Sequence, residues 1–247
     1  MLIIIPARLA STRLPNKPLA DIMGKPMIVR VFEQAKKANL GEVIVACDSP
    51  EIAEVINNVG GKAIITDANL PSGTDRIFAA MLQIPNYQNF ETIINLQGDL
   101  PLIDPLVISS AANASLKTNT DIATVASVIQ NQEEINNPNV VKIAISFADE
   151  NLTNLGQALY FSRAPIPYNS DRFYHHIGIY AYKRKALEKF VNLKPSLLEK
   201  TESLEQLRAL ENEMKIAVQI VSSHPLSVDT KEDLEKVKNF LKNNVAQ

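Results

Sequence analysis

The stretch EVIVACDSPEIAEVINNVGGKAIIT, residues 42–66, contains a strand, a helix and a second strand in immediate succession. Residues 42–47 and 62–66 are short apolar runs rich in β-branched side chains, a pattern typical of buried strands. The intervening residues, 49–60, begin with a serine suited to an N-cap and a proline suited to the first helical turn, and they end with a glycine. Two strands joined by a helix of this length predict a βαβ unit with parallel strands.

The same alternation continues on both sides of this unit and predicts an α/β fold with a mainly parallel sheet flanked by helices. Further strands are expected at residues 2–5 and 91–97, and further helices at residues 26–38, 73–84 and 104–116. Ligands of such sheets bind beyond the carboxyl ends of the strands. The loops in which a functional site is expected are therefore 6–24, 48–49, 67–73 and 97–104.

The second half of the chain is richer in strands and less regular. Strands are predicted at residues 121–129, 139–147, 157–163, 176–183 and 216–221. Helices are predicted at 185–192, at 203–213 with Ser203 as the N-cap, and at 230–244 with Thr230 as the N-cap and Asp233 completing a variant of the capping box. We interpret residues 1–247 as one α/β domain with a strand-rich region, roughly 120–195, inserted into it or appended to it.

Composition narrows the classes of protein to which the chain can belong. Hydrophobic residues make up 46% of its 247 residues, and the formal net charge is −2, so nothing in the overall balance indicates a nucleic-acid or membrane-surface partner. The single cysteine, Cys47, excludes an intrachain disulfide, which fits a reducing compartment, and its place at the end of an apolar run predicts a core thiol. No run approaches the ~18 apolar residues of a membrane-spanning helix, and the run at residues 2–5 is too short for a signal peptide, so a cytoplasmic location is expected.

Three cations follow the first predicted strand: Arg8, Arg13 and Lys17, with no acid before Asp21. A cluster of cations at the ligand-binding edge of a sheet suits a polyphosphate, which concentrates several charges in a small volume. The alternative interpretation is a solvated basic loop. Because the glycine-rich P-loop pattern is absent, side chains would do more of the phosphate binding than they do in a P-loop.

Two aspartates are candidate ligands of a divalent cation. Asp99 follows the strand predicted at 91–97, in the segment NLQGDLP, and Asp229 precedes the closing helix, in the segment SVDTKEDLEKV. Mg²⁺ prefers one or two carboxylates together with the phosphate oxygens of a substrate. Each aspartate also has a purely structural interpretation, because Asp99 could form a turn through its own hydrogen bonds and Asp229 could simply precede a helix. A further segment, PSGTDR at 71–76, opens a helix whose first backbone amides could hold a ribose or a base.

Nine segments that run in order through nearly the whole chain resemble 3-deoxy-manno-octulosonate cytidylyltransferases, also called CMP-KDO synthetases. They are IIIPARLASTRLPNKPL, GKPMI, SGTDR, NLQGDLP, NPNVVKI, ALYFSRAPIP, HIGIYAY, LEQLRAL and VDTKEDL. The first is shared more loosely with other nucleotidyltransferases, whereas ALYFSRAPIP, HIGIYAY and LEQLRAL are much more specific. The resemblance implies a nucleotide-diphospho-sugar transferase-like, Rossmann-like α/β fold and a homodimer formed largely through the strand-rich insertion. It also implies that the chain makes CMP-KDO and pyrophosphate from CTP and KDO, with Mg²⁺, for lipopolysaccharide biosynthesis.

The resemblance further implies roles for particular residues. Arg8, Lys17, Asp99 and Asp229 are expected to be catalytic, with Mg²⁺ held by the two aspartates. The nucleotide is expected to lie against Pro6, Ala7, Arg8, Arg13, Lys17, Ser72, Gly73 and Gln97. The sugar is expected to contact Arg163, His176, Tyr180, Glu205 and Gln206, with the Arg163 fork binding its carboxylate. Read without the resemblance, Arg163 is a surface ion pair, His176 is a structural histidine, and one of Glu205 and Gln206 is merely solvated.

Three positions depart from the usual sequence of the family. Asn16 stands where glycine is usual, Pro71 where glutamine is usual and Leu100 where an acid is usual. Asparagine tolerates left-handed backbone geometry, so the turn at Asn16 is expected to be kept. One alternative substrate is a related acidic sugar, either the 8-amino analogue of KDO or a sialic acid, although the opening loop lacks the G-S-K signature of CMP-sialic acid synthetases. The other alternative is a non-catalytic nucleotide-binding protein on the same fold, against which the retention of both aspartates argues.

Overall fold

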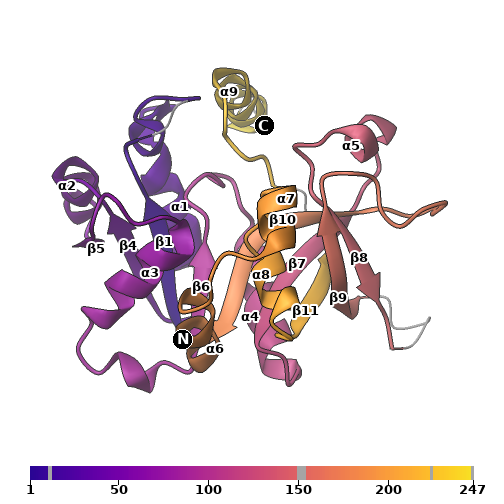
Figure 1. The fold of residues 1–247 in the computed structure, drawn as a ribbon. Helices are drawn as coiled ribbons and strands as arrows, with labels where there is room; N and C mark the ends of the chain where they lie inside the picture. The colour runs from indigo at the N-terminus through magenta and orange to yellow at the C-terminus, as the bar shows by residue number, and fades with distance from the viewer. Residues whose placement is uncertain (11–12, 149–153, 223–224, 246–247) are drawn as a thin grey trace. The chain divides into compact units, whose positions relative to one another are not determined.

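A computed structural model of the chain contains the predicted alternation of strands and helices, and it describes residues 1–10, 13–148, 154–222 and 225–245 (Figure 1). The chain divides into two units, one made of Met1–Ile108 with Pro225–Gln247 and the other of Ser109–His224. The predicted strand-rich region, roughly 120–195, lies within the second unit. The interpretation of residues 1–247 as one domain stays a prediction.

The first unit contains parallel strands in the order β5-β4-β1-β6. Their bounds are β1 Leu2–Ala7, β4 Glu42–Cys47, β5 Lys62–Ile65 and β6 Thr92–Leu96. Ile3 of β1 pairs with Val43 of β4 and with Ile94 of β6. Every residue of β1 is buried, as a continuous apolar run predicts for a central parallel strand. Cys47 is fully buried at the end of β4, as predicted, and burial raises the pKa of its thiol.

Helices of the first unit begin where the sequence places their caps. Ser49 precedes α2, Pro50–Asn58, and accepts a hydrogen bond from the amide of Ile52; Ser72 precedes α3, Gly73–Leu82. The remaining helices of this unit are α1 Met27–Lys37 and α9 Lys231–Val245, with the short turns η1 Lys17–Leu19 and η2 Tyr87–Asn89. Helix α4, Pro105–Lys117, begins in the first unit and continues into the second. Helices α1 and α3 pack against β1 and β4, and α2 packs against β4 and β5. In the described part of the chain, none of the helices is long and apolar enough to cross a membrane.

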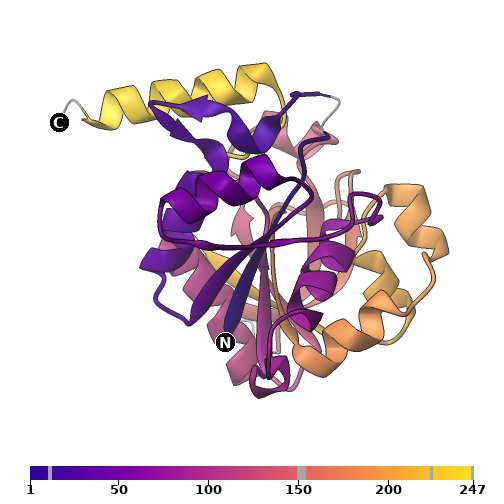
Figure 2. The ribbon, with the colours of Figure 1, turned by 90° about the vertical axis from the view of Figure 1, so that its left-hand side faces the viewer.

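The last helix is attached to the first unit by apolar residues from the opening loop. A buried cluster is formed by Leu14, Ile22, Met27, Val228 and Val237. Figure 2 shows α9 lying along the hairpin of β2, Asp21–Ile22, and β3, Lys25–Pro26. The predicted capping box is present, because the amide of Asp233 donates to the hydroxyl of Thr230 and the amide of Thr230 donates to the Asp233 carboxylate, both at 3.2 Å. These contacts determine the position of the segment that carries Asp229.

The second unit is built on a mixed sheet in the order β10-β7-β11-β9-β8, and β8 also pairs with β10. The strands are β7 Ile122–Val128, β8 Lys142–Ser146, β9 Leu155–Ser162, β10 Tyr174–Lys183 and β11 Ile216–Val221. Its short helices are α5 Gln132–Asn136, α6 Arg184–Val191, α7 Leu197–Glu202 and α8 Leu207–Glu211. Strands β7 and β11 are parallel, whereas β10 pairs with β7, and β9 with β11 and β8, in the antiparallel sense.

The prediction of one helix over residues 203–213, capped by Ser203, is wrong. Within this region only Leu207–Glu211, which is α8, is helical; α7 ends before it, at Glu202, and Ser203 adopts a left-handed conformation with φ of 54° where α7 ends. Ser203 is therefore a C-cap, and α7 begins instead with a capping box between Ser196 and Glu199. Glu205 and Gln206 consequently lie in the turn before α8 and not inside a helix.

Candidate active site

A cavity of about 320 Å³ lies in the first unit, at the carboxyl ends of β1 and β6. This is the edge at which α/β sheets bind ligands. The cavity is lined by Pro6, Ala7, Arg8, Ala10, Arg13, Lys17, Pro18, Met27, Leu70, Pro71, Ser72, Gly73, Arg76, Gln97, Gly98, Asp99 and Asp229. The structure thus brings together every residue that was predicted to be catalytic or to bind the nucleotide.

Two glycines allow the loops around the cavity to approach β1 closely. A Cβ at Gly98 would lie 2.8 Å from the carbonyl oxygen of Pro6, and a Cβ at Gly73 would lie 3.3 Å from Cγ of Pro6. The first distance is shorter than a real Cβ contact, so a larger residue at position 98 would move the turn away from β1. Because Asp99 is the next residue, this close approach sets the position of its backbone at the edge of the cavity.

The charged side chains of the cavity form one connected cluster. Nζ of Lys17 lies 3.2 Å from Oδ2 of Asp99 and 2.9 Å from Oδ1 of Asp229. Nη2 of Arg13 lies 3.3 Å from the same Asp229 oxygen. The amide of Val228 donates a 2.9 Å hydrogen bond to the carbonyl oxygen of Asp99, which fastens the segment before α9 to the turn after β6.

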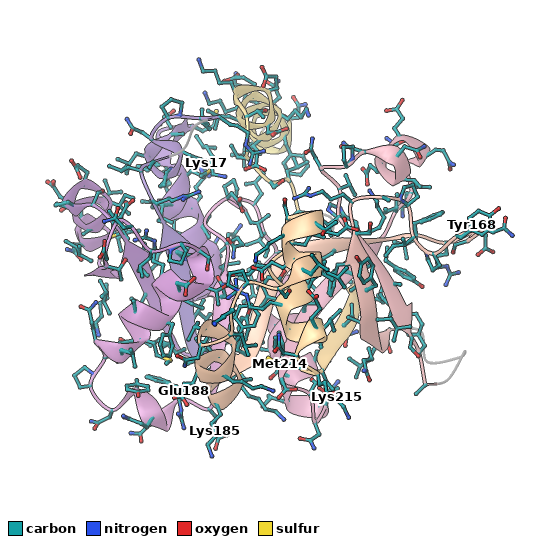
Figure 3. The ribbon with its side chains drawn as sticks, viewed as in Figure 1. Lys17, Tyr168, Lys185, Glu188, Met214 and Lys215 are labelled. Atoms are coloured by element: carbon teal, nitrogen blue, oxygen red, sulfur yellow. The ribbon has the colours of Figure 1, made fainter. Side chains whose placement is uncertain are left out.

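Lys17 is the most shielded charge of the cluster, in the segment that follows β1 (Figure 3). Burial alone would lower the pKa of its ammonium, but the carboxylates of Asp99 and Asp229 outweigh this effect and raise the pKa above its ordinary value. Lys17 is therefore protonated at neutral pH. Its charge offsets part of the repulsion between the two carboxylates.

Asp99 and Asp229 fit a Mg²⁺ ion by the chemistry of their oxygen donors. Because both carboxylates reach the same ammonium, that of Lys17, they converge on one small volume. Mg²⁺ commonly takes one or two protein carboxylates and completes its shell with water and substrate phosphate oxygens. Within the described ranges no group of three or more His, Cys, Asp or Glu side chains could hold a metal ion. The pair therefore suits an ion that is shared with a phosphate rather than one enclosed by protein alone.

The predicted nucleotide-binding residues differ in how free their polar groups are. The Ser72 hydroxyl donates a 2.7 Å hydrogen bond to the Asp75 carboxylate and accepts one from the Asp75 amide at 3.1 Å, so it is engaged in capping α3. The side-chain amide of Gln97 donates to Oδ1 of Asn95 at 3.1 Å. The roles of Ser72 and Gln97 in binding a nucleotide stay predictions.

Asn16 adopts the predicted left-handed conformation, with φ of 55°, and this turn leads directly into Lys17.

Arg76 is a residue of the cavity that our sequence analysis did not select. Its side chain is buried, and its Nη1 donates a 2.7 Å hydrogen bond to the hydroxyl of Thr66. Among the described residues no carboxylate pairs with it, although buried cations are normally paired. Its spacing of three residues from Gly73 on α3 is the signal that could have found it, because such residues share one face of a helix. A buried, unpaired cation in the wall of a cavity is suited to an anionic ligand.

Two of the predicted sugar-binding residues, His176 and Tyr180, lie on β10 of the second unit. Their ring centroids are 5.4 Å apart, and Nε2 of His176 lies 3.0 Å from the hydroxyl of Thr124. Burial, followed by the charge of His175, lowers the pKa of His176 to about 3, and burial raises the pKa of Tyr180 well above its ordinary value. Both side chains are therefore neutral at pH 7.

Within the residues that the structure describes, the guanidinium of Arg163 is hydrogen-bonded to backbone carbonyls and not to the carboxylate of a surface ion pair, and its role in sugar binding stays a prediction. Its Nε donates to the carbonyl oxygen of Glu202 at 2.9 Å, Nη1 to that of Pro138 at 2.8 Å and Nη2 to that of Ser203 at 3.3 Å. All three acceptors are backbone carbonyls, so the guanidinium connects the turn before β8 to the end of α7. Two of its five N–H donors have no acceptor among the described residues, and these remain available to a carboxylate.

Glu205 and Gln206 lie in a turn that is rigidly supported. Arg208 makes a bidentate contact with Glu199, at 2.9 Å through Nε and 2.5 Å through Nη2, and stacks over the ring of Phe190. Its Nη2 is also 3.7 Å from Oε1 of Glu205. Gln206 is buried, with 6% of its surface exposed, so neither residue of the turn is merely solvated.

The cavity and its charged cluster can be compared with known proteins. Residues 2–216 match the profile of a family described as cytidylyltransferase. The 3-deoxy-manno-octulosonate cytidylyltransferase of Parvibaculum lavamentivorans is 50% identical over 240 residues, which cover 97% of this chain and 92% of that protein. The chain belongs to the 3-deoxy-manno-octulosonate cytidylyltransferase family. The enzyme of the same name from Bartonella quintana is 52% identical over 97% of this chain and 98% of its own length.

Solved structures agree with this family and with the predicted nucleotidyltransferase fold. The structure of a CMP:2-keto-3-deoxy-manno-octonic acid synthetase complexed with CTP is similar to this chain with a TM-score of 0.89, at 38% identity and 98% coverage of both chains. The 4-diphosphocytidyl-2C-methyl-D-erythritol synthase of Anaerococcus prevotii has a TM-score of 0.64 at 13% identity over 98% of both chains, which shows a shared fold alone. The family members are nucleotidyltransferases on a Rossmann-like α/β scaffold, as predicted.

Proposed function

We propose that this chain transfers CMP from CTP to KDO, releasing pyrophosphate and giving CMP-KDO for lipopolysaccharide biosynthesis. The observation that carries the proposal is the convergence of Lys17, Asp99 and Asp229 in one cavity at the sheet edge. Relatives at about half identity over nearly the whole chain are named for the same reaction. A solved relative of the same fold is complexed with CTP.

In this proposal the cavity of the first unit holds CTP. Arg8, Arg13 and Lys17 bind the triphosphate, because clustered cations are the natural partners of a polyanion. The nucleoside lies against Pro6, Ala7, Ser72, Gly73 and Gln97. The anomeric hydroxyl of KDO attacks the α-phosphorus and gives up its proton, a new P–O bond forms, and the bond between the α-phosphorus and the oxygen that bridges it to the β-phosphate breaks. The cations stabilise the negative charge that develops on the departing pyrophosphate.

Asp99 and Asp229 are the residues that would hold Mg²⁺. Mg²⁺ bound there would neutralise phosphate charge and acidify a hydroxyl group that contacts it. Lys17 would still be needed, because it is the protonated group that contacts both carboxylates in the cavity proposed to hold the triphosphate.

The acidic sugar is proposed to bind through residues of the second unit. The two N–H donors of Arg163 that remain open are suited to its carboxylate. His176, Tyr180, Glu205 and Gln206 are candidates for hydrogen bonds with its hydroxyls.

We also propose a homodimer and a cytoplasmic location. Two large side chains of the second unit, Leu159 on β9 and Tyr168 in the loop before β10, are 58% and 98% exposed, and a self-association surface would cover such groups. Figure 3 labels Tyr168 in this loop. Sedimentation equilibrium of the wild-type chain and of the Leu159→Asp variant tests the dimer, which the charge should weaken. A cytoplasmic location agrees with the single cysteine.

Pyrophosphate release with each nucleoside triphosphate, with and without KDO and Mg²⁺, tests the reaction. Release only with CTP, KDO and Mg²⁺ together is expected. Release with 8-amino-KDO or a sialic acid but not KDO would overturn the sugar assignment. CTP binding without release in any mixture would indicate the non-catalytic alternative.

A further inference from the structure

Thr124 faces an irregularity in β10. Ile177 pairs with Val125 and Tyr180 pairs with Thr124, so two residues of β10 between them have no counterpart on β7. The Thr124 side chain is fully buried beneath this bulge. Its hydroxyl oxygen lies 2.7 Å from the carbonyl oxygen of Ile179, 3.4 Å from that of Ile177 and 3.0 Å from Nε2 of His176.

These distances determine where the protons are. A hydroxyl has one proton, and two oxygens 2.7 Å apart require a proton between them. Since the Ile179 carbonyl can only accept, Thr124 must donate to it. The remaining lone pairs of the Thr124 oxygen then face Nε2 of His176, so that nitrogen must carry a proton and donate it.

The surroundings of His176 favour the neutral ring. Phe161 packs against it in a T-shaped arrangement with 4.9 Å between centroids, and the Tyr180 ring lies 5.4 Å away. Only 6% of the residue is exposed, and burial together with the charge of His175 lowers its pKa to about 3. A neutral imidazole with a proton on Nε2 has a bare lone pair on Nδ1, to which no described residue donates.

We propose that Thr124 is a positioning residue that holds His176 as the neutral Nε2–H tautomer, so that Nδ1 accepts a hydrogen bond from a hydroxyl of the bound sugar. The identity of this ligand rests on the proposed function, whereas the tautomer does not. His176 then selects for a hydrogen-bond donor on the ligand and neither supplies nor removes a proton during the reaction. A sugar with a deoxy or O-methyl group at that position is bound less well.

The tautomer can be measured on the free protein by long-range ¹H–¹⁵N correlation of the histidine rings. The chain has three histidines, so replacing His175 and His224 with glutamine leaves the signals of His176 alone. A bare Nδ1 and a protonated Nε2, unchanged from pH 8 to pH 6, are expected. A protonated Nδ1, or a ring that titrates in this range, would overturn the proposal.

Two variants of Thr124 separate positioning from simple packing. Thr124→Ser keeps the hydroxyl and should keep both the tautomer signals and the kinetics. Thr124→Val removes the acceptor; it should mix the tautomers and raise KM for KDO about 5- to 10-fold, with KM for CTP unchanged. If Thr124→Val does not fold, the spectra of the wild type and of Thr124→Ser still test the assignment of the His176 tautomer. A wild-type chain that shows the expected tautomer but no activity with KDO would contradict the proposed substrate and leave the role of Thr124 intact. A folded Thr124→Val variant with wild-type kinetics would contradict the role of Thr124.

Discussion

Nζ of Lys17 lies 2.9 Å from Oδ1 of Asp229, although 212 residues separate them in the chain. The same ammonium is 3.2 Å from Oδ2 of Asp99. One cation therefore connects three segments: the one that follows β1, the one that follows β6 and the one that precedes α9. The stability of the cavity therefore depends on the charges of these three side chains. The predictions below follow from this cluster and from the buried groups around it.

Removing the Lys17 charge should make folding sensitive to Mg²⁺. In Lys17→Met the carboxylates of Asp99 and Asp229 lose their shared counter-ion, and because the groups are partly exposed the cost should be only about 1 kcal/mol. Mg²⁺ without nucleotide should then raise Tm more in the variant than in the wild type, as followed by differential scanning fluorimetry. Lys25→Met removes an exposed ion pair with Glu33 and is the matched control, with no added response to Mg²⁺. Equal responses in all three proteins would refute the idea that Lys17 balances a cation site.

Neutralising either aspartate should remove turnover while leaving the fold intact. Asp99→Asn and Asp229→Asn keep the side-chain shape but lose the charge, and each should lower kcat by about 100-fold or more. Asp21→Asn, at an exposed position of β2, is the control and should keep normal turnover. Steady-state pyrophosphate release and circular dichroism measure the two effects. Near-normal turnover in one variant would exclude that aspartate from the mechanism.

Replacing Arg76 should weaken the binding of CTP. Arg76→Met keeps much of the volume but removes the cation from the cavity wall, and the loss of one charge-assisted hydrogen bond should raise KM for CTP about 10-fold or more. KM for KDO should change little. Arg172→Met, at an exposed position, is the control. If Arg76→Met lowers stability without changing KM for CTP, Arg76 serves only to hold Thr66.

The stability of the chain should fall as pH drops from about 7 to 5, because of His176. Burial lowers the pKa of His176 to about 3, whereas an unfolded histidine titrates near 6.5. The unfolded state therefore binds more protons below about pH 6.5, and its free energy falls relative to the folded state by up to about 1.4 kcal/mol per pH unit. Urea denaturation at several pH values measures the slope. His176→Gln should flatten it and His175→Gln should keep most of it; the same slope in both variants would assign the effect to other groups.

The left-handed turn at Asn16 should be sensitive to the residue that occupies it. Asn16→Gly should be as stable as the wild type or slightly more so, because glycine adopts φ of 55° without strain. Asn16→Val should cost about 1–2 kcal/mol, because a β-branched side chain is strained there. Urea denaturation of the three proteins provides the comparison. Equal stability of the valine variant would show that the turn rearranges.

Local patterns in the sequence were sufficient to predict most of the helices and strands of the fold. Strand β4 and strand β11 have the predicted bounds, and the caps at Ser49 and Thr230 make the expected hydrogen bonds. Such features depend on residues a few positions apart, so a single sequence contains them. The prediction of a helix over residues 203–213 was wrong because it relied on a local pattern as well. Ser203 is a residue type that favours an N-cap, but here it adopts a left-handed conformation that ends α7.

The sequence by itself determined the βαβ framework, the cationic loop at its edge and, through family resemblance, the list of candidate residues. Only the tertiary structure decided which of them meet. It placed Asp229 beside Asp99 and Lys17 through the Val228 hydrogen bond and the packing of α9, and it directed three N–H groups of Arg163 to backbone carbonyls. It also set the hydroxyl of Thr124 against His176. Contacts of this kind join residues that are tens to hundreds of positions apart, and they arise from packing and from the pairing of buried polar groups, which no local pattern encodes.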